Sequence, residues 1–292
     1  MILVTTPTGD IGARVLQYLA DATRDVRVIV RDPSKLPDDV RRRVEVVEGS
    51  HAERAVIEPA LDGVRSVFWL PPGDPTEPSA ESAYVEFSRP FAEVLPGSGV
   101  AHVVGISALG RGWSKPAGHV SASLAMDDMI AATDVHYRAL ACASLMDNVA
   151  RQVDPILNDG VFFAPTPGGL ELPHVAKADV ATVAAQLLLK PDWRGVEEVP
   201  LYGPDDISHD GMARTLSDVL GKPVRFQEMP MEQFEGMMAS FGASEGMVRA
   251  YALMMSAKNE GMDTMTRPVP RENTPTTFRQ WCEDELRPRV AD

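Results

Sequence analysis

Two side chains stand where proton transfer to a small molecule could take place. Ser107 ends the apolar run of residues 100–106, and a hydroxyl at a strand end can hydrogen-bond a substrate or a ribose. His119 follows in a Gly-rich stretch, residues 108–121, which reads as a lid, and an imidazole titrates near neutral pH. We predict that Ser107 and His119 are the catalytic residues. The alternatives are a serine that only caps the strand end and a histidine exposed in a loop.

The first twelve residues have the pattern of a phosphate-binding turn. Residues 2–4 are apolar and lead into a Thr/Pro/Gly loop, after which an amphipathic stretch begins. A helix N-terminus offers free backbone N–H groups and a positive dipole end, so a phosphate binds well there. The loop residues that we predict to contact a dinucleotide are Thr6, Thr8, Gly9, Asp10, Ile11 and Gly12.

One glycine of the dinucleotide fingerprint is missing from this loop. Thr6 stands where the fingerprint usually has its first glycine, so only a G-x-x-G remnant is left. Gly9 still permits the turn, and Gly12 permits close packing of the helix on the strand. Taken alone, the stretch is equally compatible with an ordinary strand–helix turn.

The end of the second predicted strand, residues 26–30, indicates which dinucleotide is bound. In such folds an acidic residue there hydrogen-bonds the ribose of NAD, whereas a basic residue pairs with the 2′-phosphate of NADP. Arg31, with Ser34 and Lys35 close behind, predicts NADP(H). The adjacent Asp32 weakens this prediction, and a solvated turn of mixed charge is the alternative.

Two further strand ends lie at the same edge of the predicted sheet. Ser50 follows the third strand, residues 44–49. Leu70 and Pro71 end the apolar fourth strand and begin a stiff loop at the edge where ligands bind. We therefore add Ser50, Leu70 and Pro71 to the predicted cofactor site.

Regular alternation of strands and helices through residue 107 predicts an α/β protein with a Rossmann-type, doubly wound parallel sheet. We expect an NAD(P)-binding domain over residues 1–150, to which residues 176–203 return. A smaller, mainly helical substrate domain then comprises residues 151–175 and 204–292. Within it, residues 161–169 suggest a hairpin. Ten of the 14 methionines fall between Met212 and Met265 and predict either ordinary helix packing or a soft wall for an apolar substrate.

Composition narrows the function classes. The formal charge of −14 and the lack of a basic face argue against nucleic-acid binding. We expect no membrane span and no signal peptide, and two widely spaced cysteines suit a reducing cytoplasm. The histidines do not have the spacing of metal ligands, so we predict no metal site. The sequence has no G-x-S-x-G motif, which argues against a hydrolase. A monomer or homodimer that acts on a small molecule is the expectation.

The sequence resembles the NmrA-like branch of the atypical short-chain dehydrogenase/reductases. The resemblance implies a Rossmann domain that binds NAD(P), a smaller C-terminal domain and a ligand cleft between them. It also implies either a reductase of quinones, azo compounds or natural products, or a cofactor-sensing regulator without turnover. The pieces that carry it are residues 4–12, 31–35, 60–63 with 67–68, 102–107, 146–148, 179–181, 201–204 with 221–224, and 277–281.

Several residues depart from the family pattern. The usual short-chain dehydrogenase protonates its substrate with the tyrosine of a Tyr-x-x-x-Lys motif, and none of the five tyrosines here has a lysine four residues later. Ser50 replaces a common acidic residue, and Ser123 or a neighbour replaces the lysine of some relatives. Hydride transfer to a stacked, activated substrate does not need the motif if a proton comes from another donor.

The sequence therefore predicts an NADPH-dependent reductase of an aromatic, quinone-like or other natural-product molecule. Two alternatives stay open. One is a non-catalytic NADP(H)-binding sensor that acts through a protein partner, and the other is a Rossmann relic that acts on its ligand without net redox change.

Overall fold

Seven parallel strands form the central sheet of the computed structural model, which describes residues 1–23, 25–265 and 271–290. The chain starts in the middle at β1, fills one side, and then returns to fill the other. The order of the sheet therefore reverses between β1 and β4, where such folds bind their ligands. From edge to edge the strands are β10 (Val196–Leu201), β6 (His136–Cys142), β5 (His102–Ala108), β4 (Ser66–Trp69), β1 (Ile2–Val4), β2 (Val26–Val30) and β3 (Glu45–Glu48).

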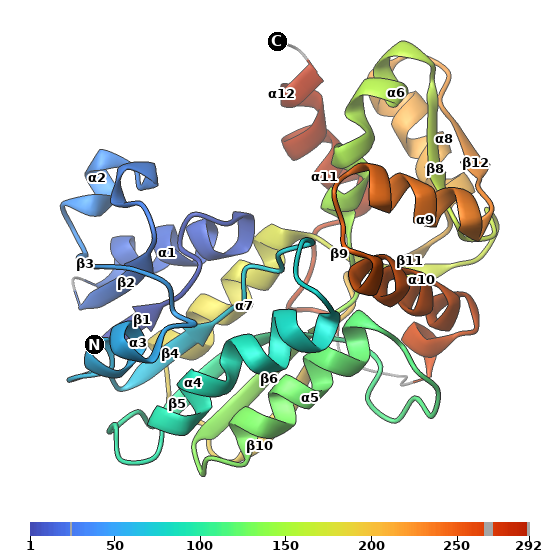
Figure 1. The fold of residues 1–292 in the computed structure, drawn as a ribbon. Helices are drawn as coiled ribbons and strands as arrows, with labels where there is room; N and C mark the ends of the chain where they lie inside the picture. The colour runs from blue at the N-terminus through green and yellow to red at the C-terminus, as the bar shows by residue number, and fades with distance from the viewer. Residues whose placement is uncertain (24, 266–270, 291–292) are drawn as a thin grey trace.

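Helices cover both faces of this sheet because its strands are apolar on both faces. Leu3 packs into one core cluster and the next residue, Val4, into the other. One face carries α1 (Asp10–Ala22), α2 (Asp38–Arg41) and α7 (Lys177–Leu189), with α1 and α7 side by side (Figure 1). The other face carries α3 (Arg54–Ala60), the π-helical turn η2 (Ser82–Glu86), α4 (Phe87–Val94) and α5 (His119–Ala131). This arrangement confirms the predicted doubly wound fold.

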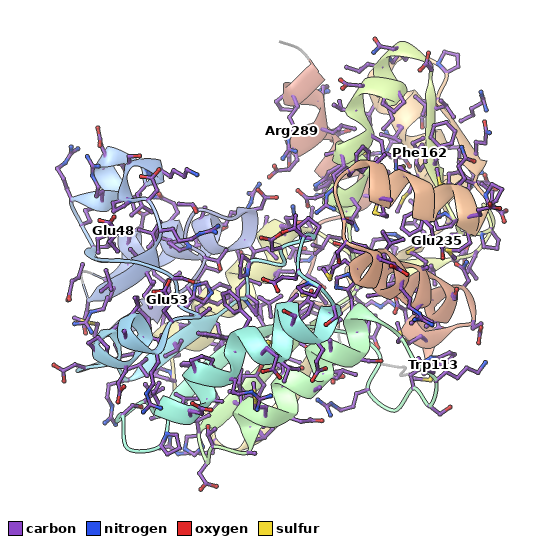
Figure 2. All side chains as sticks on the ribbon, viewed as in Figure 1. Glu48, Glu53, Trp113, Phe162, Glu235 and Arg289 are labelled. Carbon is purple, nitrogen blue, oxygen red and sulfur yellow. The ribbon has the colours of Figure 1, made fainter. Side chains whose placement is uncertain are left out.

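A smaller domain with its own core follows the sheet. Phe162, labelled in Figure 2, is 1% exposed and lies in this core. The predicted division into domains at residue 150 stays a prediction, because this core also includes Met146 and Val149. Its elements are η3 (Met146–Gln152), α6 (Val153–Asn158), β8 (Val161–Ala164), α8 (His209–Leu220), β12 (Arg225–Glu228), α11 (Phe278–Trp281), η5 (Cys282–Leu286) and α12 (Arg287–Val290).

The predicted hairpin over residues 161–169 is wrong. Strand β8 pairs in parallel with β12, some sixty residues later, instead of with its sequence neighbour. The next strand, β9 (Leu172–Val175), pairs with β7 (Ser144–Leu145) and β11 (Asp206–Ile207). Long-range pairing therefore overrides the local Gly168-Gly169 turn.

Two helices, α9 (Met231–Ser240) and α10 (Glu245–Asn259), follow β12, and the short turn η4 (Met262–Thr264) comes next. Helix α10 lies against the loop that follows β4, because the Ser244 backbone N–H donates to the Pro75 carbonyl at 3.0 Å. A Cβ on Gly246 would meet the Pro78 carbonyl oxygen at 2.0 Å, so glycine permits this contact. Met247 is fully buried there, as ordinary packing predicts, whereas α9 buries none of its residues.

Candidate functional site

The turn between β1 and α1 has the shape of a phosphate cradle. Gly9 is the N-cap residue of α1 and provides no capping side chain, so the first N–H groups of the helix are not used by a local cap. A Cβ on Gly12 would lie 2.0 Å from the Thr6 carbonyl oxygen, so only glycine lets the helix approach the strand this closely. Thr8 and Asp10 are exposed beside this N-terminus, whereas Ile11 turns into the core. The predicted loop residues therefore lie together at the N-terminus of α1, and a helix N-terminus is a place where an anion binds well.

Thr6 takes the backbone conformation of the glycine that it replaces. Its φ angle is +50°, in the left-handed region that a β-branched residue rarely enters. Its hydroxyl donates to the Leu70 carbonyl at 2.5 Å, and the hydroxyl of Thr5 donates to the Phe68 carbonyl at 3.0 Å. These bonds fasten the loop to the end of β4 and hold Thr6 in the strained conformation. The missing glycine thus leaves the geometry of the turn intact.

Arg31 lies at the end of β2, where its guanidinium is accessible to an anion. Its side chain is exposed, and among the described residues it has no ion-pair partner. Asp32 is engaged locally, because its carboxylate accepts from the Ser34 backbone N–H at 3.0 Å and from the Ser34 hydroxyl at 2.6 Å. These hydrogen bonds lower the pKa of Asp32. Asp32 therefore caps the turn η1 (Pro33–Lys35), while Arg31 and the exposed Lys35 remain available to a 2′-phosphate.

The loop that follows β3 contains a histidine that sequence reasoning missed. His51 follows the half-buried Ser50, and its Nε2 lies 3.2 Å from the Leu70 carbonyl oxygen. Its ring stands edge-on to Trp69 and Phe87, at centroid distances of 5.2 and 4.8 Å. Burial lowers the pKa of His51 to about 4, so the ring is neutral near pH 7. Its position after a predicted strand end was the only available signal.

Leu70 and Pro71 lie where this edge was predicted. The Leu70 carbonyl accepts from Thr6 and is also in contact with His51, so one backbone group joins the ends of β1, β3 and β4. Pro71 is buried directly after it. The predicted cofactor residues on these strand ends are therefore brought to one edge of the sheet, at the point where its order reverses.

Ser107 lies at the carboxyl end of β5, but its hydroxyl points at a buried carboxylate. It donates to Oδ2 of Asp127 in α5, and the Tyr137 hydroxyl donates to Oδ1 of the same residue at 2.6 Å. Burial raises the pKa of Asp127 to about 6, although both hydrogen bonds oppose the rise. Catalysis by Ser107 stays a prediction, and its hydroxyl would have to share this bond with a substrate.

The buried Asp127 predicts an unusual pH dependence of stability. Its folded pKa lies above the value near 4 of an unfolded aspartate, so its contribution is full below pH 4 and is lost as the pH rises through 6. For Asp127→Asn, the stability of wild type relative to the variant should fall by about 2–3 kcal/mol between pH 4 and pH 7. Urea unfolding of both proteins at each pH measures the difference. A pH-independent difference would contradict the assignment.

The variant comparison is needed because buried histidines act in the opposite direction. Their pKa values are lowered by burial, so they remove stability as the pH falls below about 6.5. The histidines concerned are the buried His51, His102, His119 and His174 and the half-buried His209.

His119 is placed differently from the sequence expectation. It is the first residue of α5 and is 7% exposed, instead of lying in an open lid. Its ring lies between Tyr84 of η2 and Tyr251 of α10, at centroid distances of 5.8 and 4.1 Å. Burial lowers the pKa of His119 to about 4, and its Nε2 has no hydrogen-bond partner within the described ranges. The ring is therefore neutral near pH 7, with one polar atom unsatisfied.

Metal chemistry has no visible support in the parts of the chain that the structure covers. Over those residues, there is no group of three or more His, Cys, Asp or Glu side chains that could hold a metal ion. Over the same residues, none of the helices combines the length and apolar character needed to cross a bilayer.

The arrangement fits a dinucleotide. The N-terminus of α1, beside the reversal point of the sheet, can hold a diphosphate, and the exposed Arg31 at the end of the neighbouring β2 can hold a 2′-phosphate.

The chain is similar in sequence and fold to known proteins. A family model described as NAD(P)H-binding matches residues 7–191. An NAD(P)H azoreductase of Xenophilus azovorans is 27% identical over 86% of this chain and 84% of its own. A (4-alkanoyl-5-oxo-2,5-dihydrofuran-3-yl)methyl phosphate reductase of Streptomyces griseus is 30% identical over 97% of each chain. The solved structure of an Escherichia coli NADPH-dependent quinone oxidoreductase with NADPH covers all of both chains at a TM-score of 0.80 and 20% identity.

Proposed function

The chain belongs to the NAD(P)H-binding family, and from this premise we propose that it is an NADPH-dependent reductase of an aromatic, quinone-like or other natural-product small molecule. Membership agrees with the resemblance to the NmrA-like, atypical short-chain dehydrogenase/reductases. The observation that carries the choice of NADP(H) is Arg31, exposed and unpaired in the described part of the chain, beside an Asp32 that caps its own turn.

The proposed substrate class rests on two supports. Two relatives are named as an NAD(P)H azoreductase and a (4-alkanoyl-5-oxo-2,5-dihydrofuran-3-yl)methyl phosphate reductase, which favours a small-molecule substrate for this chain. In this chain, aromatic rings from both domains meet at the first turn of α5, where Tyr84, His119 and Tyr251 lie. Flat conjugated substrates pack well against such rings.

The proposal assigns each residue of the site a role in binding the cofactor or the substrate. The α1 N-terminus holds the diphosphate, and Arg31 pairs with the 2′-phosphate. The reduced nicotinamide supplies a hydride when the cofactor is bound. His119, neutral near pH 7, is a hydrogen-bond donor or acceptor for a substrate oxygen or nitrogen, and Ser107 is a second candidate at the end of β5.

Turnover with a defined acceptor tests the proposal. Purified protein is mixed with NADPH and, separately, with a quinone, an azo dye and an α,β-unsaturated lactone, and nicotinamide absorbance is followed. We expect NADPH oxidation that depends on at least one acceptor and is slower in His119→Ala. Binding of NADPH without oxidation by any acceptor would reject the reductase proposal.

The same experiment addresses the sensor alternative. The absence of a Tyr-x-x-x-Lys motif is the sequence feature that favours it. A protein that binds NADPH tightly, oxidises it with none of these acceptors and captures a protein partner only when NADPH is present would support a sensor.

A further inference from the structure

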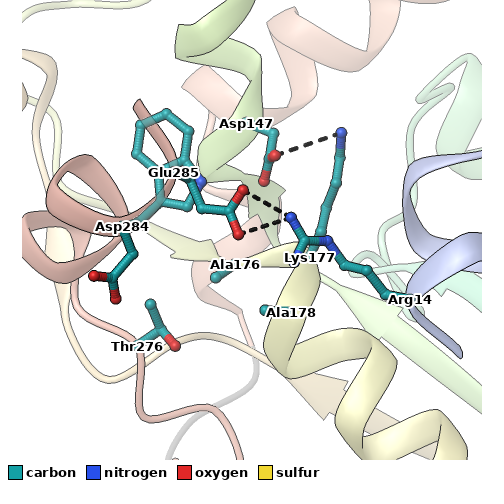
Figure 3. Close-up of a pocket in the computed structure, with 9 residues that line it drawn as sticks. Arg14, Asp147, Ala176, Lys177, Ala178, Thr276, Asp284 and Glu285 are labelled. Atoms are coloured by element: carbon teal, nitrogen blue, oxygen red, sulfur yellow. Dashed lines mark hydrogen bonds and ion pairs between the residues drawn. The ribbon is translucent and has the colours of Figure 1, made fainter. Parts of the chain in front are cut away.

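Lys177 is a buried ammonium at the place where two helices begin. It is the first residue of α7, and its side chain is only 8% exposed. Its Nζ donates to the Asp10 carboxylate in the first turn of α1, and it lies 3.7 Å from Oδ1 of Asp147 (Figure 3). The residues that line the pocket drawn in Figure 3 include Lys177, Asp147 and Arg14.

The position is unfavourable for a cation unless an anion comes near. The N-terminus of a helix is the positive end of its dipole, and α7 begins without a capping side chain. Helices α1 and α7 pack side by side, so Lys177 adds its charge to two positive helix ends (Figure 1). Desolvation of its ammonium adds to the cost. The two helix ends therefore attract anions, and in this structure the anions beside Lys177 are the carboxylates of Asp10 and Asp147.

Asp10 is equally unusual in its own place. Its carboxylate is 76% exposed at the first residue of α1, the helix end expected to hold the diphosphate. The hydrogen bond from Lys177 lowers the pKa of Asp10, so it is charged near pH 7. A carboxylate beside a diphosphate repels it, unless a cation stands next to both.

Lys177 has a second anchor that does not depend on Asp10. Asp147 is 6% exposed, and its Oδ2 has no hydrogen-bond partner among the described residues. The indole N–H of Trp281, which lines the same pocket, also lacks one there. Since Asp147 keeps an attraction for the ammonium, loss of the Asp10 carboxylate should leave Lys177 at this site.

We propose that Lys177 is a binding residue for the cofactor diphosphate and that Asp10 is an internal anion that competes for the same ammonium. Asp10 holds Lys177 when no phosphate is present, and the diphosphate takes over this contact on binding. The inference rests on the proposed NADP(H) site but does not depend on hydride transfer.

The two partners of one ion pair should then change affinity in opposite directions. Asp10→Asn should tighten NADPH and NADH by about threefold each, because a repulsive charge is removed. Lys177→Met should weaken both by about fivefold to tenfold. Isothermal titration calorimetry with NADPH and with NADH measures the affinities. Lys190→Met, an exposed lysine just beyond the other end of α7, is the matched control and should change neither.

The results that overturn the proposal are distinct from a failure of the proposed function. If Asp10→Asn and Lys177→Met both weaken binding, or neither changes it, the pair is only structural and the proposal falls. Thermal unfolding shows whether Lys177→Met is folded, and Asp10→Asn, whose site is exposed, decides the question if it is not. If wild type binds neither NADPH nor NADH, the cofactor assignment itself is wrong.

Discussion

Replacing Arg31 with alanine is expected to weaken NADPH binding by about tenfold to a hundredfold, while NADH binding stays nearly unchanged. Arg31 is exposed and has no carboxylate partner within the described ranges, so its charge is available to a 2′-phosphate. Charge-assisted hydrogen bonds of this kind contribute about 1.5–3 kcal/mol. NADH lacks the 2′-phosphate and therefore lacks the interaction. Titration calorimetry with both dinucleotides measures the selectivity.

The control for Arg31 is another exposed arginine outside the predicted site. Arg41 pairs with Asp38 in α2, and Arg41→Ala should leave the affinities for NADPH and NADH unchanged. If Arg31→Ala weakened both dinucleotides equally, Arg31 would act on a part that they share, and selectivity for NADP(H) would need another source. Because Lys177 is proposed to act on the shared diphosphate, the two variants should be separable by this comparison alone.

The sheet and the cofactor edge could be predicted because their signals are local. A strand buried on both faces is a short apolar run, as in residues 66–70, and a phosphate-binding helix begins at a glycine turn. The turn could be predicted although Thr6 replaces the first glycine of the dinucleotide fingerprint, because the loop residues around Thr6 still specify the turn. The positive φ of Thr6 was not readable from the sequence, because it depends on hydrogen bonds to a strand more than sixty residues away.

The surroundings of the candidate catalytic residues could not be predicted for the same reason. His119 is buried by Tyr251, which approaches from α10 more than a hundred residues later. The Ser107 hydroxyl meets Asp127 only because α5 packs on β5. Asp127 is 1% exposed, although an aspartate in a helix usually faces solvent. Proton chemistry depends on such contacts between elements, so the residue types indicated candidates but not their environments.

Gly12→Ala is expected to lower the free energy of unfolding and to weaken NADPH binding. The new Cβ would lie 2.0 Å from the Thr6 carbonyl oxygen and 2.9 Å from its carbonyl carbon, and backbone atoms cannot move aside as a side chain can. Since overpacking costs about 1–3 kcal/mol and this clash involves two backbone segments, we expect a loss near the upper end of that range. Urea unfolding and NADPH calorimetry measure the two effects.

A glycine in another helix serves as the control. It separates the steric clash at Gly12 from the general difference in helix propensity between glycine and alanine. Gly236 lies inside α9, and a Cβ there would meet nothing within 4 Å. Gly236→Ala should therefore be neutral or stabilising by up to about 1 kcal/mol, because alanine favours a helix over glycine. Opposite signs for the same substitution in two helices would assign the loss at position 12 to the approach of α1 to β1. If Gly12→Ala bound NADPH as tightly as wild type, the close turn would not be the diphosphate site, and the anion-binding role of Lys177 beside it would lose its basis.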